Sequence, residues 1–156
     1  MITARINIDP AMKEMEKNLK ELSKMSVAVG VLSGAGTYKN GTEITTIASV
    51  HEFGAPHKNI PQRSFLRVPF AHEKIRLNKV IDKSFMALAN GKISVKSAYD
   101  IIGAEARNIV IKAFSTSGFG KWEGNSNITV AKKGSSKPLI DTGRLMQSIT
   151  WEVRHD

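Results

Sequence analysis

The residues best suited to chemistry lie in one stretch, "SVHEFGAPHKNIPQRSFLR", residues 49–67. His51, Glu52 and His57 supply two imidazoles and a carboxylate, which are ligands for transition metals. A turn at Gly54 would bring the two histidines closer together. No histidine pair has the H-E-x-x-H spacing that places two metal ligands on one face of a helix. We therefore interpret His51 as a helix-end residue and His57 as a loop residue, and we predict no metal site and no cofactor.

Other motifs that resemble catalytic or phosphate-binding sequences are incomplete. "GTYKNGTE" has Thr42 where a P-loop requires the lysine that holds the phosphates. "DTG" matches the aspartic-protease triplet, but its single aspartate would need a second one from a partner. We instead expect Asp141 or Thr142 to cap a short helix that begins near Gly143. The chain has no cysteine, which excludes a thiol nucleophile. The sequence thus predicts no catalytic residue and no enzyme.

Hydrophobic periodicity predicts the elements that position these residues. Alternating or continuous apolar runs predict strands at 2–8, 26–32 and 149–154. Apolar residues at helical spacing predict helices at 10–24, 43–52, 69–89 and 94–113. The order predicts an α+β fold in a single domain, residues 1–156. We expect a small mixed or antiparallel sheet packed by the N-terminal helix and the two longer central helices, with long loops.

The first predicted strand has the pattern of a half-buried strand. Its apolar residues alternate with polar or charged ones: Ile2, Ala4, Ile6 and Ile8 against Thr3, Arg5 and Asn7. Asp9 and Pro10 follow as a helix cap and a first helical residue. The segment is charged and lacks the apolar core of a signal peptide, so we do not expect secretion.

The loop before the first long central helix contains two prolines, Pro56 and Pro61, which favour an extended chain around them. We predict a stiff, open arm whose ends are anchored in apolar pockets by Phe53, Phe65 and Leu66. Arg63 and Arg67 stand on either side of that anchor. They are predicted to be free to pair with carboxylates of a neighbouring subunit.

Residues 115–138 are rich in Gly and Ser and have no periodicity, which is unusual for so long a segment of a compact domain. Trp122, Ile128 and Val130 make it too apolar for a simple linker. We predict an assembly arm ordered largely by a neighbouring molecule rather than by the core of its own domain. Its "NITV" sequence would add a strand to a neighbour's sheet edge, with Ile128 and Val130 filling pockets.

The net charge is +9, from 23 Lys and Arg against 14 Asp and Glu. This charge favours nucleic acid or an acidic protein surface as a neighbour. The basic residues are dispersed among acidic ones, and no zinc-finger, RNA-recognition or helix-turn-helix signature occurs. No apolar run approaches the length of a transmembrane helix. Any DNA contact is therefore expected to be weak and independent of sequence.

Two segments resemble a known group of proteins. "HEFGAPHKNIPQRSFLR" resembles the E-F/Y-G…I-P-x-R-x-F-L-R segment of neck and tail-completion proteins of tailed bacteriophages, which include the minor tail protein Z family and the virion-morphogenesis proteins. "KWEGNSNITVAKKGSSKPLIDTGRLMQSITWEV" is similar to their W-x-P-x-S-x-x-T…K-G…P-L-x-D-T-G-x-L-x-x-S-I segment. The residues that match are Gly54, Pro61, Phe65, Leu66, Leu139, Asp141, Thr142, Gly143 and Leu145. The sequence departs from the pattern at Ser64, Val68 and Glu123-Gly124.

The resemblance implies a structural tail-completion (neck) protein of a tailed phage or prophage. Such a protein forms a ring, expected to be a hexamer, at the head-proximal end of the tail, and docks the tail to the head. The implied partners are copies of itself, the tail terminator or tube protein, the head–neck connector protein, and genomic DNA passing through the lumen; no membrane is implied. The implied location is the virion, after assembly in the host bacterial cytoplasm. The alternatives are a tail-terminator or head-closure protein of the same neck, and a non-specific DNA-binding protein.

Overall fold

A computed structural model describes residues 9–155, apart from the side chains of residues 132 and 133. The elements are α1 (Pro10–Leu22), β1 (Met25–Val31), α2 (Ile44–Phe53), a 3-10 turn η1 (Pro56–Lys58), α3 (Arg67–His72), α4 (Lys74–Ala89), α5 (Val95–Ser115), α6 (Asn127–Lys133), α7 (Arg144–Gln147) and β2 (Ile149–His155). The described residues thus contain seven α-helices and one two-stranded antiparallel sheet, which confirms the predicted α+β class. The strand predicted at 2–8 lies outside them.

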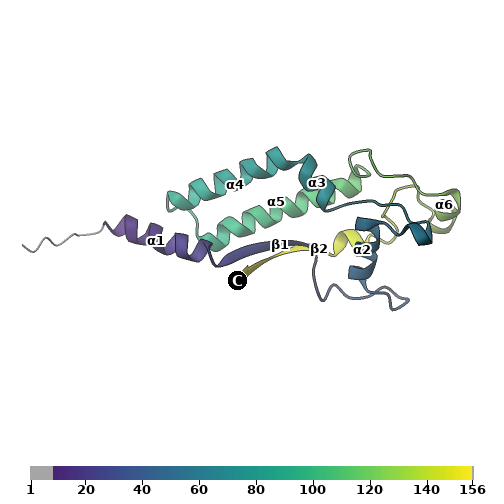
Figure 1. The fold of residues 1–156 in the computed structure, drawn as a ribbon, viewed down its shortest axis with the longest axis horizontal. Helices are drawn as coiled ribbons and strands as arrows, with labels where there is room; N and C mark the ends of the chain where they lie inside the picture. The colour runs from purple at the N-terminus through teal and green to yellow at the C-terminus, as the bar shows by residue number, and fades with distance from the viewer. Residues whose placement is uncertain (1–8, 156) are drawn as a thin grey trace, which may run out of the picture.

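Helix α5 and the β1–β2 sheet form the central layers of the molecule (Figure 1). The strands pair over their full length, from Met25 opposite His155 to Val31 opposite Ile149. The buried face of α5 includes three alanines and a glycine, so its backbone can lie close to the sheet. Helix α4 packs along α5 as an outer layer (Figure 1).

Gly103 is the point of closest approach between α5 and the sheet. A Cβ built on Gly103 would overlap the indole of Trp151 on β2 and would lie 3.0 Å from Cγ2 of Val27 on β1. The indole has little freedom to move, because its Nε1 donates to Asp100 Oδ1 at 3.4 Å from the same helix. Only a residue without a side chain fits at this contact.

Replacing Gly103 with alanine is therefore expected to destabilise the protein by about 1–3 kcal/mol, the usual cost of overpacking a core. Helix propensity alone predicts the opposite, a gain of about 1 kcal/mol. Asn108→Ala, at an exposed position of the same helix, serves as the control. Denaturant midpoints of the three proteins decide between these effects, and a Gly103→Ala protein more stable than the natural one would refute the close contact.

Most helix ends form where the sequence predicts them. Asp9 caps α1, with its Oδ1 accepting from Ala11 N at 2.8 Å. Ser94 caps α5 in the same way, with its Oγ accepting from Ser97 N at 3.1 Å. Gly54 ends α2 with a φ of 78°, a conformation that glycine adopts without strain. The predicted cap at Asp9 is confirmed, and the predicted helices at 43–52 and 94–113 end at Gly54 and begin at Ser94, respectively.

The helix predicted over 69–89 is instead two helices, α3 and α4, separated at Glu73. Helix α3 begins before Pro69, which lies in its first turn, where a missing N–H costs no hydrogen bond. The Glu73 carboxylate accepts a hydrogen bond from Lys112 Nζ of α5 at 2.7 Å. This bond holds the break between α3 and α4 against the central helix. Periodicity did not predict the break because it depends on a contact with a distant element.

The N-terminal helix contacts β1 and α5, but it covers little of the sheet. Helix α1 projects from one end of the molecule (Figure 1), and none of its residues is buried. Only Leu22, at its last position, packs against the core cluster of Met25, Leu88 and Val95. Its hydrophobic stripe is real, but it lines a groove of about 540 Å³ with the end of α4 rather than the sheet. Met15 and Leu19 stay more than half exposed there.

Candidate functional site

The two segments that carry the candidate residues meet at the end of the molecule opposite α1 (Figure 1). Phe65 from the first segment packs with Leu139 and Leu145 from the second in one buried cluster. Trp122 packs against this cluster, with its ring centroid 5.7 Å from that of Phe114, which lies 5.3 Å from Phe65. Phe65 is 0 % exposed, as expected of an anchor.

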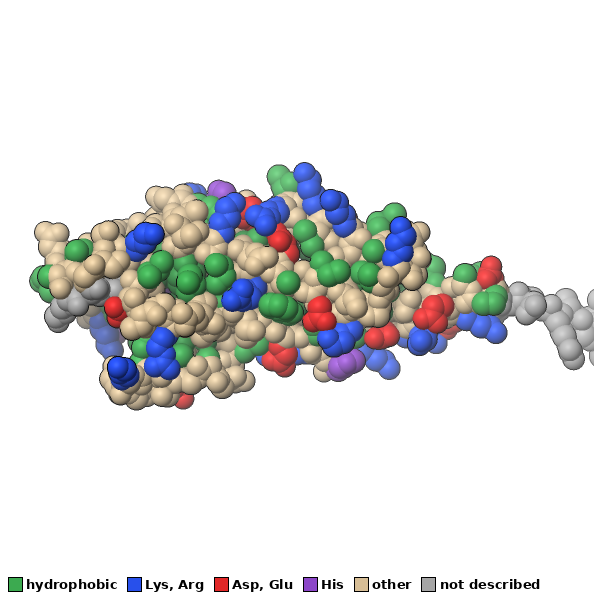
Figure 2. Space-filling model, turned by 180° about the vertical axis from the view of Figure 1, so that it is seen from behind, with side chains coloured by type: hydrophobic (Ala, Val, Ile, Leu, Met, Phe, Trp, Pro, Cys, Tyr) green, Lys and Arg blue, Asp and Glu red, His purple; other side chains and the backbone are tan. Residues whose placement is uncertain are grey.

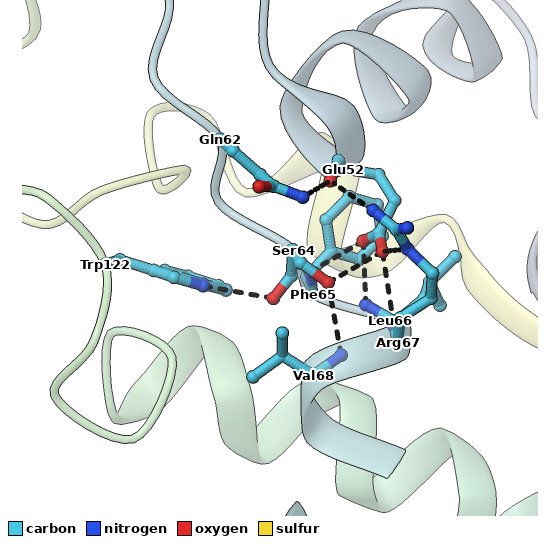
Figure 3. Close-up of polar contacts among 8 residues, drawn as sticks. All are labelled: Glu52, Gln62, Ser64, Phe65, Leu66, Arg67, Val68 and Trp122. Atoms are coloured by element: carbon cyan, nitrogen blue, oxygen red, sulfur yellow. Dashed lines mark hydrogen bonds and ion pairs between the residues drawn. The ribbon is translucent and has the colours of Figure 1, made fainter. Parts of the chain in front are cut away.

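Glu52, in the last turn of α2, is the polar centre of this end of the molecule (Figure 3). The residue is only 4 % exposed. Its carboxylate accepts hydrogen bonds from Ser64 Oγ at 2.7 Å and from the backbone N–H groups of Phe65 and Leu66 at 2.8 and 2.9 Å. It also accepts from Arg67, from the backbone N at 3.2 Å and from Nε at 2.9 Å.

This carboxylate replaces the missing cap of α3. The N-cap position of α3 is Leu66, whose side chain cannot accept a hydrogen bond. Glu52 satisfies the first N–H groups from a different helix, and Ser64 Oγ accepts from the next free one, Val68 N, at 3.1 Å. A negative charge at a helix N-terminus is also favoured by the helix dipole. The arrangement fixes the angle between α2 and α3.

The pKa of Glu52 reflects two opposing effects. Burial raises the pKa of this carboxyl, whereas hydrogen bonds from Ser64, the Arg67 side chain and the backbone of Leu66 and Arg67 lower it. The hydrogen bonds prevail, so the pKa lies below its usual value. Glu52 is therefore held as a carboxylate that stabilises the fold, rather than as a proton donor poised near neutral pH.

The structure corrects the roles predicted for Arg67 and Phe53. Arg67 is not a free cation, because it pairs with Glu52 of the same chain. Phe53 was expected to fill an apolar pocket, but it is 63 % exposed. Its ring lies beneath the Arg67 guanidinium, with Cζ 4.5 Å from the ring centroid. Phe53 thus contacts the guanidinium that pairs with the buried carboxylate.

The loop after Gly54 is closed, not the open arm that its prolines predict. Ala55 and Ile60 exchange two backbone hydrogen bonds, at 2.9 and 3.1 Å, around η1. Asn59 adopts a left-handed conformation with a φ of 53°, which turns the chain back. Prolines at both ends restrict the chain, but the turn between them decides its direction. Pro61 is half-buried at the exit of this loop.

Arg63 was predicted to contact another subunit, and this too is corrected. It is 7 % exposed, and its Nε and Nη2 donate to the backbone carbonyls of Glu123 and Gly124 at 2.9 Å each. Burial lowers the pKa of this guanidinium, while the charge of Glu123 raises it. Arg63 therefore joins the first segment to the second across 60 residues of sequence.

Residues 115–138 are only partly the arm that the sequence predicts. Trp122 Nε1 donates to Ser64 O at 3.1 Å, so the first part of the segment is bound to its own domain. The predicted strand at "NITV" is wrong: these residues lie in α6, which Ser126 caps by accepting from Thr129 N at 3.3 Å. Ile128, 73 % exposed, is the large apolar side chain that this helix presents to solvent.

The second segment also differs from its prediction at the short helix α7. Its N-cap is Gly143, with a φ of 75°, and neither Asp141 nor Thr142 makes a capping bond. Both of these side chains are exposed. Leu139 and Leu145 are buried on either side of this turn. The "PLIDTGRL" sequence thus positions two apolar anchors, and the glycine makes the sharp turn between them.

A groove of about 640 Å³ lies between the two segments. Its lining includes Tyr38, His51, Arg63, Asp141, Arg144 and Leu145. The Arg144 guanidinium lies 5.6 Å from the Tyr38 ring centroid. Burial raises the pKa of Tyr38, Arg144 lowers it and Asp141 raises it, with a net rise. The groove therefore holds charges of both signs and a neutral phenol.

The candidate metal ligands do not form a cluster. Over residues 9–155, no three His, Cys, Asp or Glu side chains are placed to hold a metal ion. His51 lines the groove, whereas His57 is exposed in η1 on the closed loop. The residue that sequence reasoning missed is Glu52, which it treated only as a possible metal ligand. Its position two residues before the helix-ending Gly54, in the segment that carries the resemblance, was the available signal.

Comparison of the chain with protein-family models, with curated proteins and with solved structures finds no match. In the part of the chain that the structure describes, no helix is both long enough and apolar enough to cross a bilayer.

Proposed function

We propose that this chain is a structural tail-completion (neck) protein of a tailed phage or prophage. In this role it forms a ring, expected to be a hexamer, at the head-proximal end of the tail and docks the tail to the head. The proposal starts from the resemblance of two sequence segments. The observation that supports it most is that these segments form one structural unit, joined by Arg63 to Glu123 and Gly124 and by Trp122 to Ser64.

This unit uses its polar groups to build a rigid end. The Glu52 carboxylate binds backbone N–H groups, the Arg63 guanidinium binds backbone carbonyls, and the Trp122 N–H binds another. A catalytic group must instead direct its polar atoms towards a substrate. Polar side chains that hydrogen-bond to the backbone stabilise the fold, which supports a structural function for this protein.

Helix α1 supports assembly with other copies. Met12, Met15 and Leu19 lie on one face of it and are 64, 56 and 55 % exposed. An apolar face of this kind is typical of a helix that is covered in an assembly. Lysines and glutamates both flank it, and hydrophobic and oppositely charged side chains stand together on this projection (Figure 2). A copy of the same chain would meet no large excess of like charge here.

The proposed partners are other copies of the chain, the tail terminator or tube protein, the head–neck connector, and genomic DNA in the lumen. The positive charge is spread over the face in Figure 2, with no single patch. A diffuse field attracts phosphates weakly and independently of sequence, which suits a passage for DNA. The proposed location is the virion.

Electron microscopy and native mass measurement of the purified protein, alone and mixed with tail tubes, test the proposal. We expect rings that seat on the head-proximal end of the tubes. Rings that form but do not bind tubes would contradict the neck role, and rings that stop tube growth would favour the tail-terminator alternative. Monomers that shift DNA at physiological salt would favour the DNA-binding alternative.

Substitution in α1 tests the assembly surface. Met15→Glu places a charge in the apolar stripe, where burial in a subunit contact would be costly. We expect the dissociation constant of the subunit contact to rise at least about tenfold, which favours monomers. Lys17→Ala changes the net charge equally, on the polar face, and is expected to leave rings intact. Equal assembly of the two variants would show that α1 does not contact a neighbour.

A further inference from the structure

Arg63 is a buried cation without a bound anion. The residue is 7 % exposed, and burial lowers the pKa of its guanidinium more than the charge of Glu123 raises it. Among residues 9–155, no carboxylate forms an ion pair with Arg63. A guanidinium has five N–H groups, and two of those of Arg63 bind the carbonyls of Glu123 and Gly124. Buried charges in proteins are usually paired with an opposite charge, so this cation is suited to an anion supplied by a ligand.

Arg63 lines the groove of about 640 Å³ between the two segments, a volume typical of a ligand site. The second arginine of the lining, Arg144, is half-buried against an aromatic ring and also forms no ion pair within the described residues. The other charged side chains of the lining are exposed: Lys39, Glu123 and Asp141. The least exposed charges of the groove are therefore positive, whereas its carboxylates are accessible to water.

The rest of the lining combines apolar and hydrogen-bonding side chains. Leu139 and Leu145 are buried, and Ile60 is half-buried beside them in the lining. Asn59 and Thr42 add an amide and a hydroxyl, which suit the N–H and C=O groups of a peptide backbone. A matching ligand carries an anionic group, apolar groups beside it and a polar backbone. A DNA strand offers the anionic group but not the aliphatic side chains, so a peptide segment matches the groove better.

We propose that this groove binds an extended segment of another protein, in which an acidic residue is flanked by apolar residues. The carboxylate of the segment pairs with the Arg63 guanidinium, a strong and directional contact between an arginine and a carboxylate. Arg144 adds positive charge to the same groove, and the apolar neighbours of the acidic residue pack on Leu139 and Leu145. The inference rests on the proposed function for the need to dock another protein, but it concerns a site within a single copy of the chain.

Calorimetric titration with short peptides tests the site. The probe is a five-residue peptide of alternating leucine and aspartate, blocked at both ends, and the reference peptide has asparagine in place of each aspartate. The two peptides have nearly the same shape and differ in charge. We expect the aspartate peptide to bind at least about tenfold more tightly, because hydrogen bonds between two charged groups are stronger than those to a neutral amide. Equal affinities, or no binding of the aspartate peptide, would overturn the proposal.

A matched pair of arginine variants separates the groove from the overall charge of +9, which attracts any acidic peptide. Arg144→Gln removes a charge from the groove, and Arg154→Gln removes one from an exposed position on β2. We expect Arg144→Gln to weaken binding of the aspartate peptide at least about fivefold. Arg154→Gln should change it by less than about twofold, because salt screens exposed charges. Equal losses would show that the net charge, and not the groove, attracts the peptide.

Arg63 is best observed in the natural protein, because its replacement would also disturb the contact between the two segments. Nuclear magnetic resonance of the arginine Nε–H groups reports on it directly. We expect the Arg63 signal to shift on addition of the aspartate peptide and to stay in place with the asparagine peptide. An Arg63 signal that does not move when the aspartate peptide is saturating would exclude Arg63 as the partner of the carboxylate and overturn the proposal.

Competing probes and a monomeric variant separate the remaining outcomes. Hexanoate that displaces the aspartate peptide at equal concentration would indicate a site for a small organic acid, and a DNA duplex that displaces it would indicate a site for phosphate. Either result overturns the protein partner. Met15→Glu, which we expect to be monomeric, should bind the aspartate peptide as the natural protein does. Peptide binding by a natural protein that forms no rings would contradict the neck proposal and support the groove, whereas rings that bind no peptide would do the reverse.

Discussion

Replacing Glu52 with alanine is expected to lower the free energy of unfolding by about 3–5 kcal/mol, because it leaves several buried donors without their acceptor, at about 1–3 kcal/mol each. The substitution leaves the N–H groups of Phe65 and Leu66 without their acceptor, and Arg67 without its carboxylate. Thermal or denaturant unfolding measures the loss. Glu14→Ala, an exposed glutamate on α1, is the control and should change stability by no more than about 0.5 kcal/mol. Equal effects would refute the central role of Glu52.

The same carboxylate predicts a dependence on pH. The pKa of Glu52 is lower in the folded protein than its ordinary value of 4.5. The stability that it contributes is therefore complete above the ordinary value and is lost as the pH falls through the folded pKa. Other carboxylates add to acid unfolding, so the comparison that matters is with Glu52→Gln. This variant should be less stable at neutral pH and should lose less stability on acidification, and parallel curves would contradict the argument.

Replacing Phe65 with alanine is expected to cost about 3–5 kcal/mol. The ring is 0 % exposed and packs against Phe114 in the cluster that also contains Leu139 and Leu145. Its removal leaves a cavity between the two segments that form the candidate site. Since natural domains are stable by only about 5–15 kcal/mol, the variant is expected to unfold at a much lower temperature and to assemble poorly.

Phe53→Ala is the matched control for Phe65→Ala. Both residues belong to the same segment, but Phe53 is 63 % exposed and contacts mainly the Arg67 guanidinium. We expect its loss to cost no more than about 1 kcal/mol, the size of an exposed cation–π contact. A Phe53→Ala protein that is stable but forms no rings would identify this side chain as a subunit contact. A Phe65→Ala protein with an unchanged melting temperature would show that the anchor assignment is wrong.

The sequence alone determined the elements that depend on neighbouring residues. The cap at Asp9, the cap at Ser94 and the glycine after α2 are all interactions over a few residues. Strands β1 and β2 follow from β-branched and alternating residues, and the α+β class follows from the order of elements. The burial of Phe65 was also predicted, but the same reasoning was wrong for Phe53 of the same segment, which is 63 % exposed.

Tertiary structure alone decided the partners of the charged residues and the positions of the loops. Arg63 and Arg67 appeared free in the sequence. The buried Arg63 guanidinium must find acceptors, and these lie 60 residues away. The exposed Arg67 guanidinium pairs with a buried carboxylate on a different helix. The break at Glu73 and the closed loop after Gly54 likewise depend on contacts that no local pattern encodes. Helix α1 shows the converse: its periodicity determined the helix and its apolar face, but in residues 9–155 that face only borders a groove with α4 and stays largely exposed. Local hydrogen bonds and hydrophobic periodicity involve residues that are close in the sequence, so the sequence alone predicts them. The hydrogen-bond partners of buried charges and the packing of apolar faces depend on which distant segments the fold brings together.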